Sequence, residues 1–525
     1  MVYSSTEKTN FLKNLIMIST DNILKFTEKY SGLYVAVAIC AVLKILMVLP
    51  NPDINPDGVL YIAAAKCFEE GHFQEGLALY PMPLYPLLIT VVHYMVPNWI
   101  LSARMISIVS ITLVMFPLYF LIKLLFNSKA AFWGILAYAV SPAPNEWGIL
   151  IVRGPCFALT FMEAIYFACQ SLVRFRLSDF FGAILCSTLA VLFRIEGIVF
   201  FLVYLGTVCF FIIKKQIPWK IGVGILLFIG TVGIAYKMAG TNHTLRFNRF
   251  GEVIQYVNGI KTFGFLDNYH KIYESLKDLE QKALFPGGKQ NLAELARHYM
   301  PLLYLIGLFH LLIKVLFPSY LIPLWFGFKK TPSRPIGFLI ITFICYMLLL
   351  YFFLIKRDFL QERFLKVPAL LLFPWVGAGL EHITSIIGQK SKKTTRTAMI
   401  LLCLCLVTPL IKTVCIMTKP HTITRTAGTW IAKHSEYQNA RIITTDARIP
   451  FYAGRLKGNY QIFRKKNYER IEQTAIRNKK DLLIIKTARK CKKHIGSFQH
   501  YRKIKQFAEK KDVVLIFKAE NPAKS

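Results

Sequence analysis

The chain has 525 residues, of which 54% are hydrophobic and only 18% are charged, and its formal net charge is +35. This composition is too apolar for a water-soluble globular protein. Because basic residues gather at the ends of apolar runs, the positive charge indicates orientation in a membrane and attraction to anionic head groups or phosphate-bearing substrates, not binding of nucleic acid. The 11 cysteines lie mostly inside apolar runs and form no CxxC pair, which argues against a zinc knuckle or a disulfide framework.

Apolar segments of the length of a membrane span recur along the chain. One span needs about 20 helical residues, since a helix rises about 1.5 Å per residue through about 30 Å of hydrocarbon. We expect eleven spans, near residues 33–49, 102–124, 130–144, 155–172, 179–193, 197–213, 219–236, 300–328, 336–355, 365–387 and 397–416. Within 293–328, one long tilted helix and an interfacial helix followed by a span fit equally well.

Lysines before the first span and basic connections between later spans predict a cytoplasmic N-terminus. With an odd number of spans, three long segments then lie on the outer side, at 50–100, 237–299 and 418–525. The chain divides into a membrane domain, 1–417, and a soluble domain, 418–525. A cytoplasmic position for the soluble domain stays open, because the domain carries 26 Lys or Arg against 8 Asp or Glu.

The soluble domain shows alternating signals for helices and strands. Helices are expected at 425–437, 467–479 and 499–511, and strands at 441–445, 482–486 and 513–518. The sequence therefore predicts a polytopic α-helical membrane protein with a small, basic C-terminal α/β domain.

The first outer loop is the most informative stretch for chemistry. Asp57 follows a proline at the start of an expected helix, and Tyr61 lies one turn later on the same side, so both could meet one substrate. Asp57 could instead only cap this helix, and its spacing alone leaves both interpretations open. The proline-rich block Tyr80–Pro86 predicts a second short helix lying in the membrane interface, and Arg104 lies at the head of the next span.

Ionisable residues also occur within or beside apolar spans, where their burial indicates a functional or paired group. Glu163 lies in the middle of the fourth span, and Arg194 and Glu196 lie at a span boundary. Because Arg194 and Glu196 are two residues apart, they do not face each other on one helix and are expected to pair with other helices. The sequence contains no metal-binding motif, although His72 and Glu69 could contribute to a weak divalent metal site.

Five short sequences occur in an order and topology that one family shares: Pro56–Tyr61 (PDGxxY), Tyr80–Pro86, Ala103-Arg104, Glu362–Pro368 and Asp446–Tyr452. Together they resemble the GT-C glycosyltransferases, in particular bacterial lipid A aminoarabinose transferases, protein O-mannosyltransferases and lipopolysaccharide-core sugar transferases. The chain departs from these relatives at three points. Gly58 stands where some of them carry a second acidic residue, and Leu79 and Tyr80 stand where the aminoarabinose transferases have a lysine. In the loop after the third expected span, relatives often have an acidic residue at the start of the next helix, whereas this chain has Asn145, Glu146 and then Arg153-Gly154.

The resemblance implies roles for individual residues. In that family the first acidic residue of the loop deprotonates or orients the acceptor, and here that residue is Asp57. Basic residues near the membrane hold the donor phosphate, and the matching residues are Arg357, Arg363 and Arg104, although Arg357 and Arg363 could instead only anchor spans. Further candidates for the substrate site are Tyr61, Lys66, Glu146, Arg153, Glu163, Arg194 and Glu196.

The predicted function is therefore inverting transfer of a hexose or pentose from a polyprenyl-phosphate donor to a lipid, glycan or protein acceptor. The predicted location is the outer face of a bacterial inner membrane. One alternative is a transporter or flippase for a lipid or an anionic solute, which should place paired broken helices near the midplane of the membrane. Another is a membrane-anchored assembly factor whose basic soluble domain does the binding.

Overall fold

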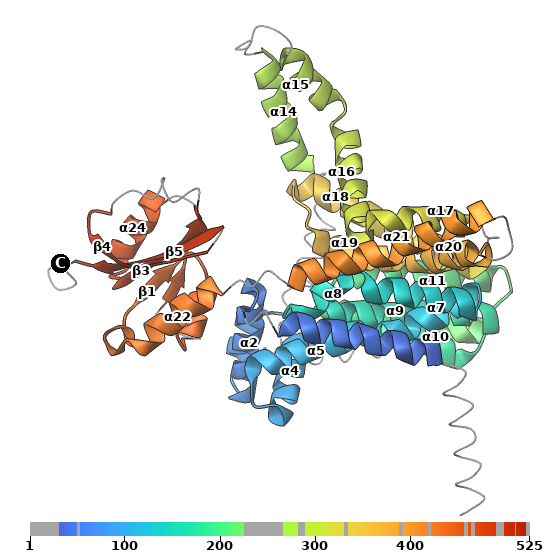
Figure 1. The fold of residues 1–525 in the computed structure, drawn as a ribbon, viewed down its shortest axis with the longest axis horizontal. Helices are drawn as coiled ribbons and strands as arrows, with labels where there is room; N and C mark the ends of the chain where they lie inside the picture. The colour runs from blue at the N-terminus through green and yellow to red at the C-terminus, as the bar shows by residue number, and fades with distance from the viewer. Residues whose placement is uncertain are drawn as a thin grey trace, which may run out of the picture.

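The computed structural model describes residues 31–49, 53–224, 266–281, 289–329, 334–387, 392–417, 422–455, 460–463, 468–489, 498–509 and 511–520. A bundle of apolar helices is joined to a small α/β domain at the C-terminal end of the chain (Figure 1). Five of the described helices are long and apolar enough to cross a membrane, and two bent pairs bring the number to as many as seven. The chain is a multi-pass membrane protein, as predicted.

The described helices of the membrane part overlap most of the expected spans, and others lie in the expected outer loops. In chain order they are Ser31–Val48, α2 (Pro56–Glu69), α3 (Phe73–Leu79), α4 (Leu84–Met95), α5 (Trp99–Leu113), α6 (Met115–Leu125), α7 (Ser128–Val140), α8 (Pro142–Ile149), α9 (Gly154–Arg174), α10 (Leu177–Phe193), α11 (Gly197–Ile213), α14 (Asp267–Gln281), α15 (Lys289–His298), α16 (Met300–Leu316), η2 (Pro318–Tyr320), α17 (Leu321–Phe328), α18 (Arg334–Arg357), α19 (Glu362–Leu370), α20 (Phe373–Ser385) and α21 (Lys392–Met417). The span expected at 219–236 and the loop expected at 237–299 lie largely outside the described residues. The total of eleven spans therefore stays a prediction.

Two of the expected late spans are bent. Helices α16 and α17 meet at 93°, and α19 and α20 meet at 58°. The first bend follows from Phe317, whose φ of 88° ends the helix just before a proline. One long helix through 300–328 is therefore wrong, because the chain changes direction there.

Glycine lets the late helices approach one another at backbone distance. A Cβ on Gly379 of α20 would lie 1.7 Å from the carbonyl oxygen of Pro323 in α17, and one on Gly377 would lie 2.4 Å from that of Ala130 in α7. Only a residue without a side chain fits at such contacts. Helix α20 is thereby held against α7 and α17.

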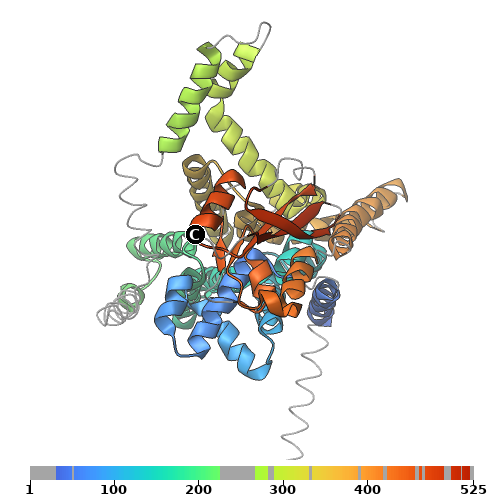
Figure 2. The same ribbon diagram turned by 90° about the vertical axis from the view of Figure 1, so that its left-hand side faces the viewer.

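The first loop forms a helical cluster at the end of the bundle that faces the soluble domain (Figures 1 and 2). Helix α4, the short second helix expected from the proline block, packs on α2: the hydroxyl of Thr90 donates to the carbonyl oxygen of Ala65 at 3.0 Å. The rings of Tyr61 and Tyr85 meet edge to face, with centroids 5.0 Å apart. These contacts fix α2 against α4.

The soluble domain is a three-layer α/β unit. Its sheet has the strand order β2-β1-β3-β5-β4, with β1 parallel to β2 and β3, and with β5 antiparallel to β3 and β4. The elements are α22 (Ile423–Lys433), η3 (Ser435–Tyr437), β1 (Ile442–Thr444), α23 (Arg448–Tyr452), β2 (Tyr460–Ile462), α24 (Tyr468–Arg477), β3 (Leu482–Ala488), β4 (Tyr501–Ala508) and β5 (Asp512–Ala519). Helix α22 covers one face of the sheet and α24 the other, which explains why β3 begins with four consecutive buried residues.

Residues 499–511 were expected to form a helix, and this prediction was wrong because Tyr501–Ala508 form strand β4. Apolar side chains recur there at every third residue, at Tyr501, Ile504 and Phe507, which imitates a helical pattern. A shift in the register with β5 in the middle of the strand accounts for the spacing. As a result, Tyr501 packs on one face of the sheet and the other two side chains pack on the opposite face.

Candidate active site

Asp57 lies in the first turn of α2, and the fold brings it to Arg363 in the first turn of α19, 306 residues further along the chain. Nη1 of Arg363 donates to Oδ2 of Asp57 at 2.9 Å, and both side chains are about half exposed. The N-cap position of α2 belongs to Asn55, whose side chain is bonded to the backbone of Ile151. Asp57 is therefore not the N-cap residue, and its carboxylate faces a cation that was predicted to bind phosphate.

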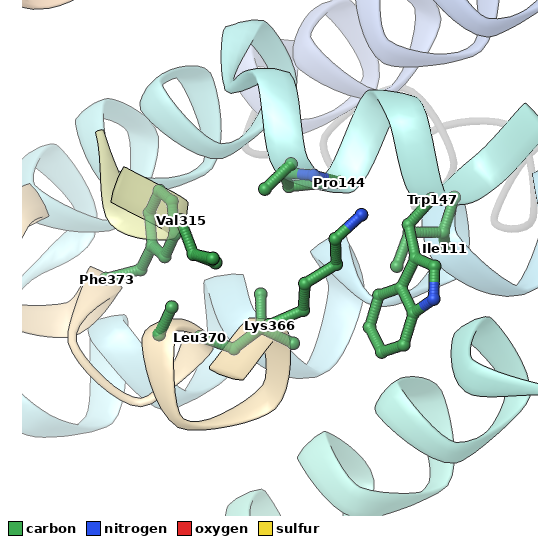
Figure 3. Close-up of a pocket in the computed structure, with 9 residues that line it drawn as sticks. Ile111, Pro144, Trp147, Val315, Lys366, Leu370 and Phe373 are labelled. Carbon is green, nitrogen blue, oxygen red and sulfur yellow. The ribbon is translucent and has the colours of Figure 1, made fainter. Parts of the chain in front are cut away.

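Lys366 lies one turn after Arg363 on α19, and sequence reasoning missed it. Its Nζ lies 3.1 Å from Oε2 of Glu146, and its side chain is only 6% exposed, whereas that of Glu146 is 44% exposed. The lysine stem crosses a small pocket beside Trp147 (Figure 3). The other residues that line this pocket are apolar: Ile111, Ala143, Pro144, Val315, Ala369, Leu370 and Phe373. The spacing of three residues from Arg363 could have revealed Lys366, because residues so spaced share one face of a helix.

A third ion pair lies on the same helix. Nζ of Lys314 in α16 is 2.6 Å from Oε1 of Glu362, and both side chains are exposed. Three cation–carboxylate pairs thus surround α19, and their members come from four different helices. Each pair is neutral by itself. An anionic ligand would therefore compete with the protein carboxylates for these cations.

Arg194 and Glu196 pair with each other, and the expectation that they pair with other helices was wrong. Nη2 of Arg194 lies 2.6 Å from Oε1 of Glu196. The rule of helical spacing does not apply here because Arg194 is extended, with φ −149° and ψ 130°, in the break between α10 and α11. The Arg194 guanidinium lies 5.2 Å from the ring centroid of Phe364, and the Arg363 guanidinium lies 5.3 Å from the same ring. Phe364 therefore links the two arginines.

Arg153 and Tyr61 are connected through Tyr80. Nη1 of Arg153 donates to the carbonyl oxygen of Phe193 at 3.0 Å, and its guanidinium lies 5.6 Å from the ring of Tyr80. Tyr80 in turn packs edge to face on Tyr61, with centroids 4.8 Å apart. Burial, together with the neighbouring Tyr80 and Asp57, raises the pKa of the Tyr61 hydroxyl. The hydroxyl is therefore protonated at neutral pH and can donate a hydrogen bond.

The fold agrees with one group of known enzymes. The crystal structure of ArnT from Cupriavidus metallidurans bound to undecaprenyl phosphate superposes with a TM-score of 0.53 at 14% identity, over 94% of this chain and 99% of that one. The Archaeoglobus fulgidus oligosaccharyltransferase tethered with an acceptor peptide superposes with a TM-score of 0.56 at 13% identity, over 89% of this chain and 70% of that one. This chain has the GT-C fold.

The sequence comparisons agree with the fold. The family model for dolichyl-phosphate-mannose-protein mannosyltransferase matches residues 80–234 of this GT-C chain. No curated protein matches the sequence. The matched segment runs from the proline block before α4 through α11, so it contains Arg153, Arg194 and Glu196 and ends before α19.

Four of the candidates from the sequence have other surroundings in this GT-C fold. Arg104 is 7% exposed, and its Nη2 donates to the carbonyl oxygen of Asp53 at 2.6 Å. Lys66 lies 5.4 Å from the ring of Trp99, Glu163 lies 3.9 Å from Sγ of Cys186, and Arg357 is exposed at the last position of α18. Their predicted roles stay predictions.

No group of three or more His, Cys, Asp or Glu side chains is arranged to hold a metal ion in the described part of the chain. His72 pairs with Glu70 at 3.5 Å, and Glu69 pairs with His93 at 3.8 Å. A weak divalent site at His72 and Glu69 stays a prediction.

Proposed function

We propose that the protein transfers a sugar from a polyprenyl-phosphate carrier to a lipid, glycan or protein acceptor at the outer face of the membrane. The observation that carries the proposal is the contact between Asp57 and Arg363. It brings a carboxylate that can take a proton and a guanidinium that can bind phosphate to one place. The fold supports the proposal, because the similar ArnT structure is bound to undecaprenyl phosphate.

The chemistry follows from these groups. The acceptor hydroxyl gives its proton to the carboxylate of Asp57 while its oxygen forms a bond to the anomeric carbon of the sugar. The bond from that carbon to the phosphate oxygen breaks, and the electron pair leaves with the polyprenyl phosphate. Arg363 and Lys366 bind the negative charge that grows on the phosphate, which lowers the barrier. A single displacement of this kind inverts the anomeric centre.

The ion pair also explains how donor binding prepares the base. In the structure, one oxygen of Asp57 accepts a hydrogen bond from Arg363. The phosphate of the donor is an anion and competes for the guanidinium, since arginine binds phosphate in the same planar geometry as a carboxylate. Binding of the donor would therefore free an oxygen of Asp57 for the acceptor proton.

A transporter is the second candidate, because broken helices are typical of transporters and the described part of the chain has two bent pairs, α16–α17 and α19–α20. These pairs follow one another in the second half of the chain, whereas transporter repeats place them at corresponding positions of two halves. A transporter would move the sugar lipid without breaking its glycosidic bond. Release of free polyprenyl phosphate therefore distinguishes the two functions.

Binding of undecaprenyl phosphate to the purified protein tests the donor site, with undecaprenol as the matched lipid that lacks phosphate. A ligand that binds only the folded state, at a hundredfold excess over its Kd, stabilises a protein by about 2.7 kcal/mol. We expect undecaprenyl phosphate to raise the unfolding temperature and undecaprenol to leave it unchanged, and Arg363→Ala to reduce the difference. Equal effects of the two lipids on the wild type would contradict a phosphate site.

A further inference from the structure

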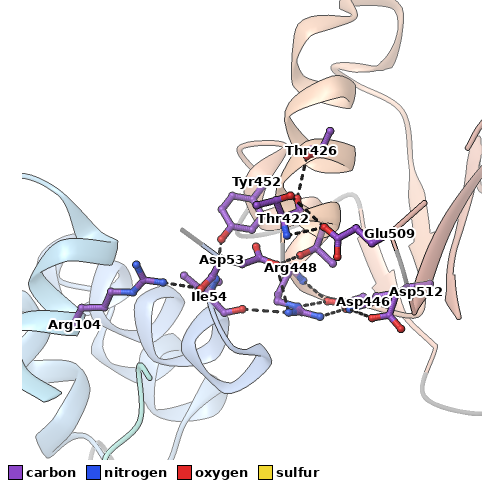
Figure 4. A network of polar contacts seen from close by, with 12 residues as sticks. Asp53, Ile54, Arg104, Thr422, Thr426, Asp446, Arg448, Tyr452, Glu509 and Asp512 are labelled. Carbon is purple, nitrogen blue, oxygen red and sulfur yellow. Dashed lines mark hydrogen bonds and ion pairs between the residues drawn. The ribbon is translucent and has the colours of Figure 1, made fainter. Parts of the chain in front are cut away.

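The soluble domain contacts the chain immediately before α2 (Figure 4). The backbone N–H of Ile54 donates to the hydroxyl oxygen of Tyr452 at 2.9 Å, and Nη1 of Arg448 donates to the carbonyl oxygen of Ile54 at 3.3 Å. The hydroxyl of Thr424 donates to Oδ2 of Asp53. Both backbone groups of Ile54 and the side chain of its neighbour are thus held by α22 and α23.

Arg448 connects this contact to charges inside the soluble domain. Its Nη1 lies 3.6 Å from Oδ2 of Asp53, and its Nη2 lies 2.6 Å from Oδ2 of Asp446. Lys486 lies 3.6 Å from Asp446 and 3.4 Å from Asp512. The side chains of Arg448, Asp446 and Asp53 are at most 13% exposed, so water screens these charges weakly.

The state of Asp446 agrees with a strong network. Burial alone would raise the pKa of this carboxyl, but the hydrogen bonds and charge of Arg448 and the charge of Lys486 hold it below its ordinary value. Removing one partner from a buried ion pair leaves an uncompensated charge, which destabilises the contact strongly. The network therefore resists opening at neutral pH.

The residues held in this way lie directly before the proposed base. Helix α2 begins at Pro56, and its N-cap Asn55 is fixed to Ile151 of the membrane domain. The start of α2 is consequently held from two sides, by the membrane domain at Asn55 and by the soluble domain at Asp53 and Ile54. A displacement of a reacting group by about 1 Å can cost a hundredfold in rate.

We propose that the soluble domain positions Asp57 for the reaction through Arg448 and Tyr452, which are positioning residues and do not touch the substrate. This inference rests on the proposed function, because it takes the sugar transfer as the step for which α2 is held in place. Arg104 belongs to the same arrangement, since it donates to the backbone of Asp53 from the membrane side.

Three variants of the full-length protein test the proposal. Arg448→Met removes the positive charge at the contact. Tyr452→Phe removes only the hydroxyl that accepts the hydrogen bond from the Ile54 N–H. Arg441→Met is the matched control, because Arg441 pairs with Asp481 within the soluble domain at 3.2 Å. The measurements are hydrogen exchange in residues 53–61, product formation in cells, and stabilisation of the purified protein by undecaprenyl phosphate.

We expect Arg448→Met to accelerate hydrogen exchange in residues 53–61 and to lower product formation by about tenfold or more. The apparent affinity for undecaprenyl phosphate, measured by thermal stabilisation, should stay within about twofold of wild type. Tyr452→Phe should change exchange and product formation in the same direction by less, and Arg441→Met should change neither. Wild-type exchange or wild-type product formation in Arg448→Met would overturn the proposal. If the wild type binds no undecaprenyl phosphate, the proposed function fails, and the exchange measurement still decides whether the soluble domain holds α2.

Discussion

Nη1 of Arg363 donates to Oδ2 of Asp57 at 2.9 Å, across 306 residues of sequence. One of these residues was predicted to act on the acceptor and the other on the donor phosphate. Their contact means that the two substrates of the proposed reaction would meet at one point, at the starts of α2 and α19. It also means that substitution of either residue changes the surroundings of the other.

Asp57→Asn should leave folding and membrane insertion intact and remove most of the activity. Asparagine keeps the shape of the side chain and loses the negative charge that a general base needs. Such a base typically contributes about 10²- to 10⁴-fold in rate, and we expect a loss of that size in kcat. Glu70→Gln, just beyond the other end of α2, is the matched control and should retain full turnover. Near wild-type turnover in purified Asp57→Asn would mean that Asp57 is not the base and only contributes a favourable charge at the start of the helix.

Arg363→Ala should weaken binding of the donor more than binding of the acceptor. A charge-assisted contact to phosphate contributes about 1.5–3 kcal/mol, or roughly ten- to a hundredfold in the KM of the donor. Arg363→Lys should recover only part of this loss, because lysine keeps the charge without the planar fork that binds two oxygens. Lysine orients a span as well as arginine does, so full recovery by lysine would indicate an anchoring role.

Lys366→Met should raise the KM of the donor about tenfold with little effect on stability, as expected for the loss of one contact to a charged group. Methionine preserves the apolar stem that packs beside Trp147 and Leu370, and the remaining Glu146 is 44% exposed. Glu146→Gln separates the two possible roles of the lysine. If Lys366 binds phosphate, this change removes its competing carboxylate and should preserve or strengthen donor binding. An unchanged donor KM in Lys366→Met would exclude a role for the lysine at the phosphate.

Gly379→Ala should lower the unfolding temperature of the purified protein. The added methyl group would lie 1.7 Å from the carbonyl oxygen of Pro323, so α17 and α20 would have to separate. Gly337→Ala is the matched control, since a Cβ at that position of α18 meets no atom within 4 Å. Because alanine favours a helix over glycine, the control should be as stable as wild type or more stable. Equal unfolding temperatures for both variants would contradict close packing of these two helices.

Membrane helices could be predicted well from the sequence, because each is marked by one long run of apolar residues. The length of the apolar runs located the membrane helices, because a helix needs a minimum number of apolar residues to cross the hydrocarbon of a membrane. The bend at Phe317 and the bulge in β4 could not be predicted, since each depends on a local backbone conformation that periodicity does not encode. In β4 the tertiary pairing with β5 overrode an apparent helical pattern.

The candidate site was predicted in its parts but not in its assembly. Asp57 and Arg363 lie in short sequences with recognisable chemistry, yet no spacing rule relates residues 306 positions apart. The pair of Arg194 and Glu196 was misjudged because the spacing rule assumes a continuous helix, and the chain is extended at Arg194. Lys366 was overlooked although its position relative to Arg363 places both on one face of α19.

Comparative mass spectrometry of envelope glycolipids and glycoproteins tests the central claim most directly. Cells that produce the wild-type protein, cells that produce Asp57→Asn at equal membrane abundance, and cells without the protein are compared. The account predicts a glycoconjugate that is present only with the wild type, accompanied in the other two strains by accumulation of the corresponding polyprenyl-phosphate sugar. Identical glycoconjugates and identical lipid-linked sugars in all three strains would contradict it.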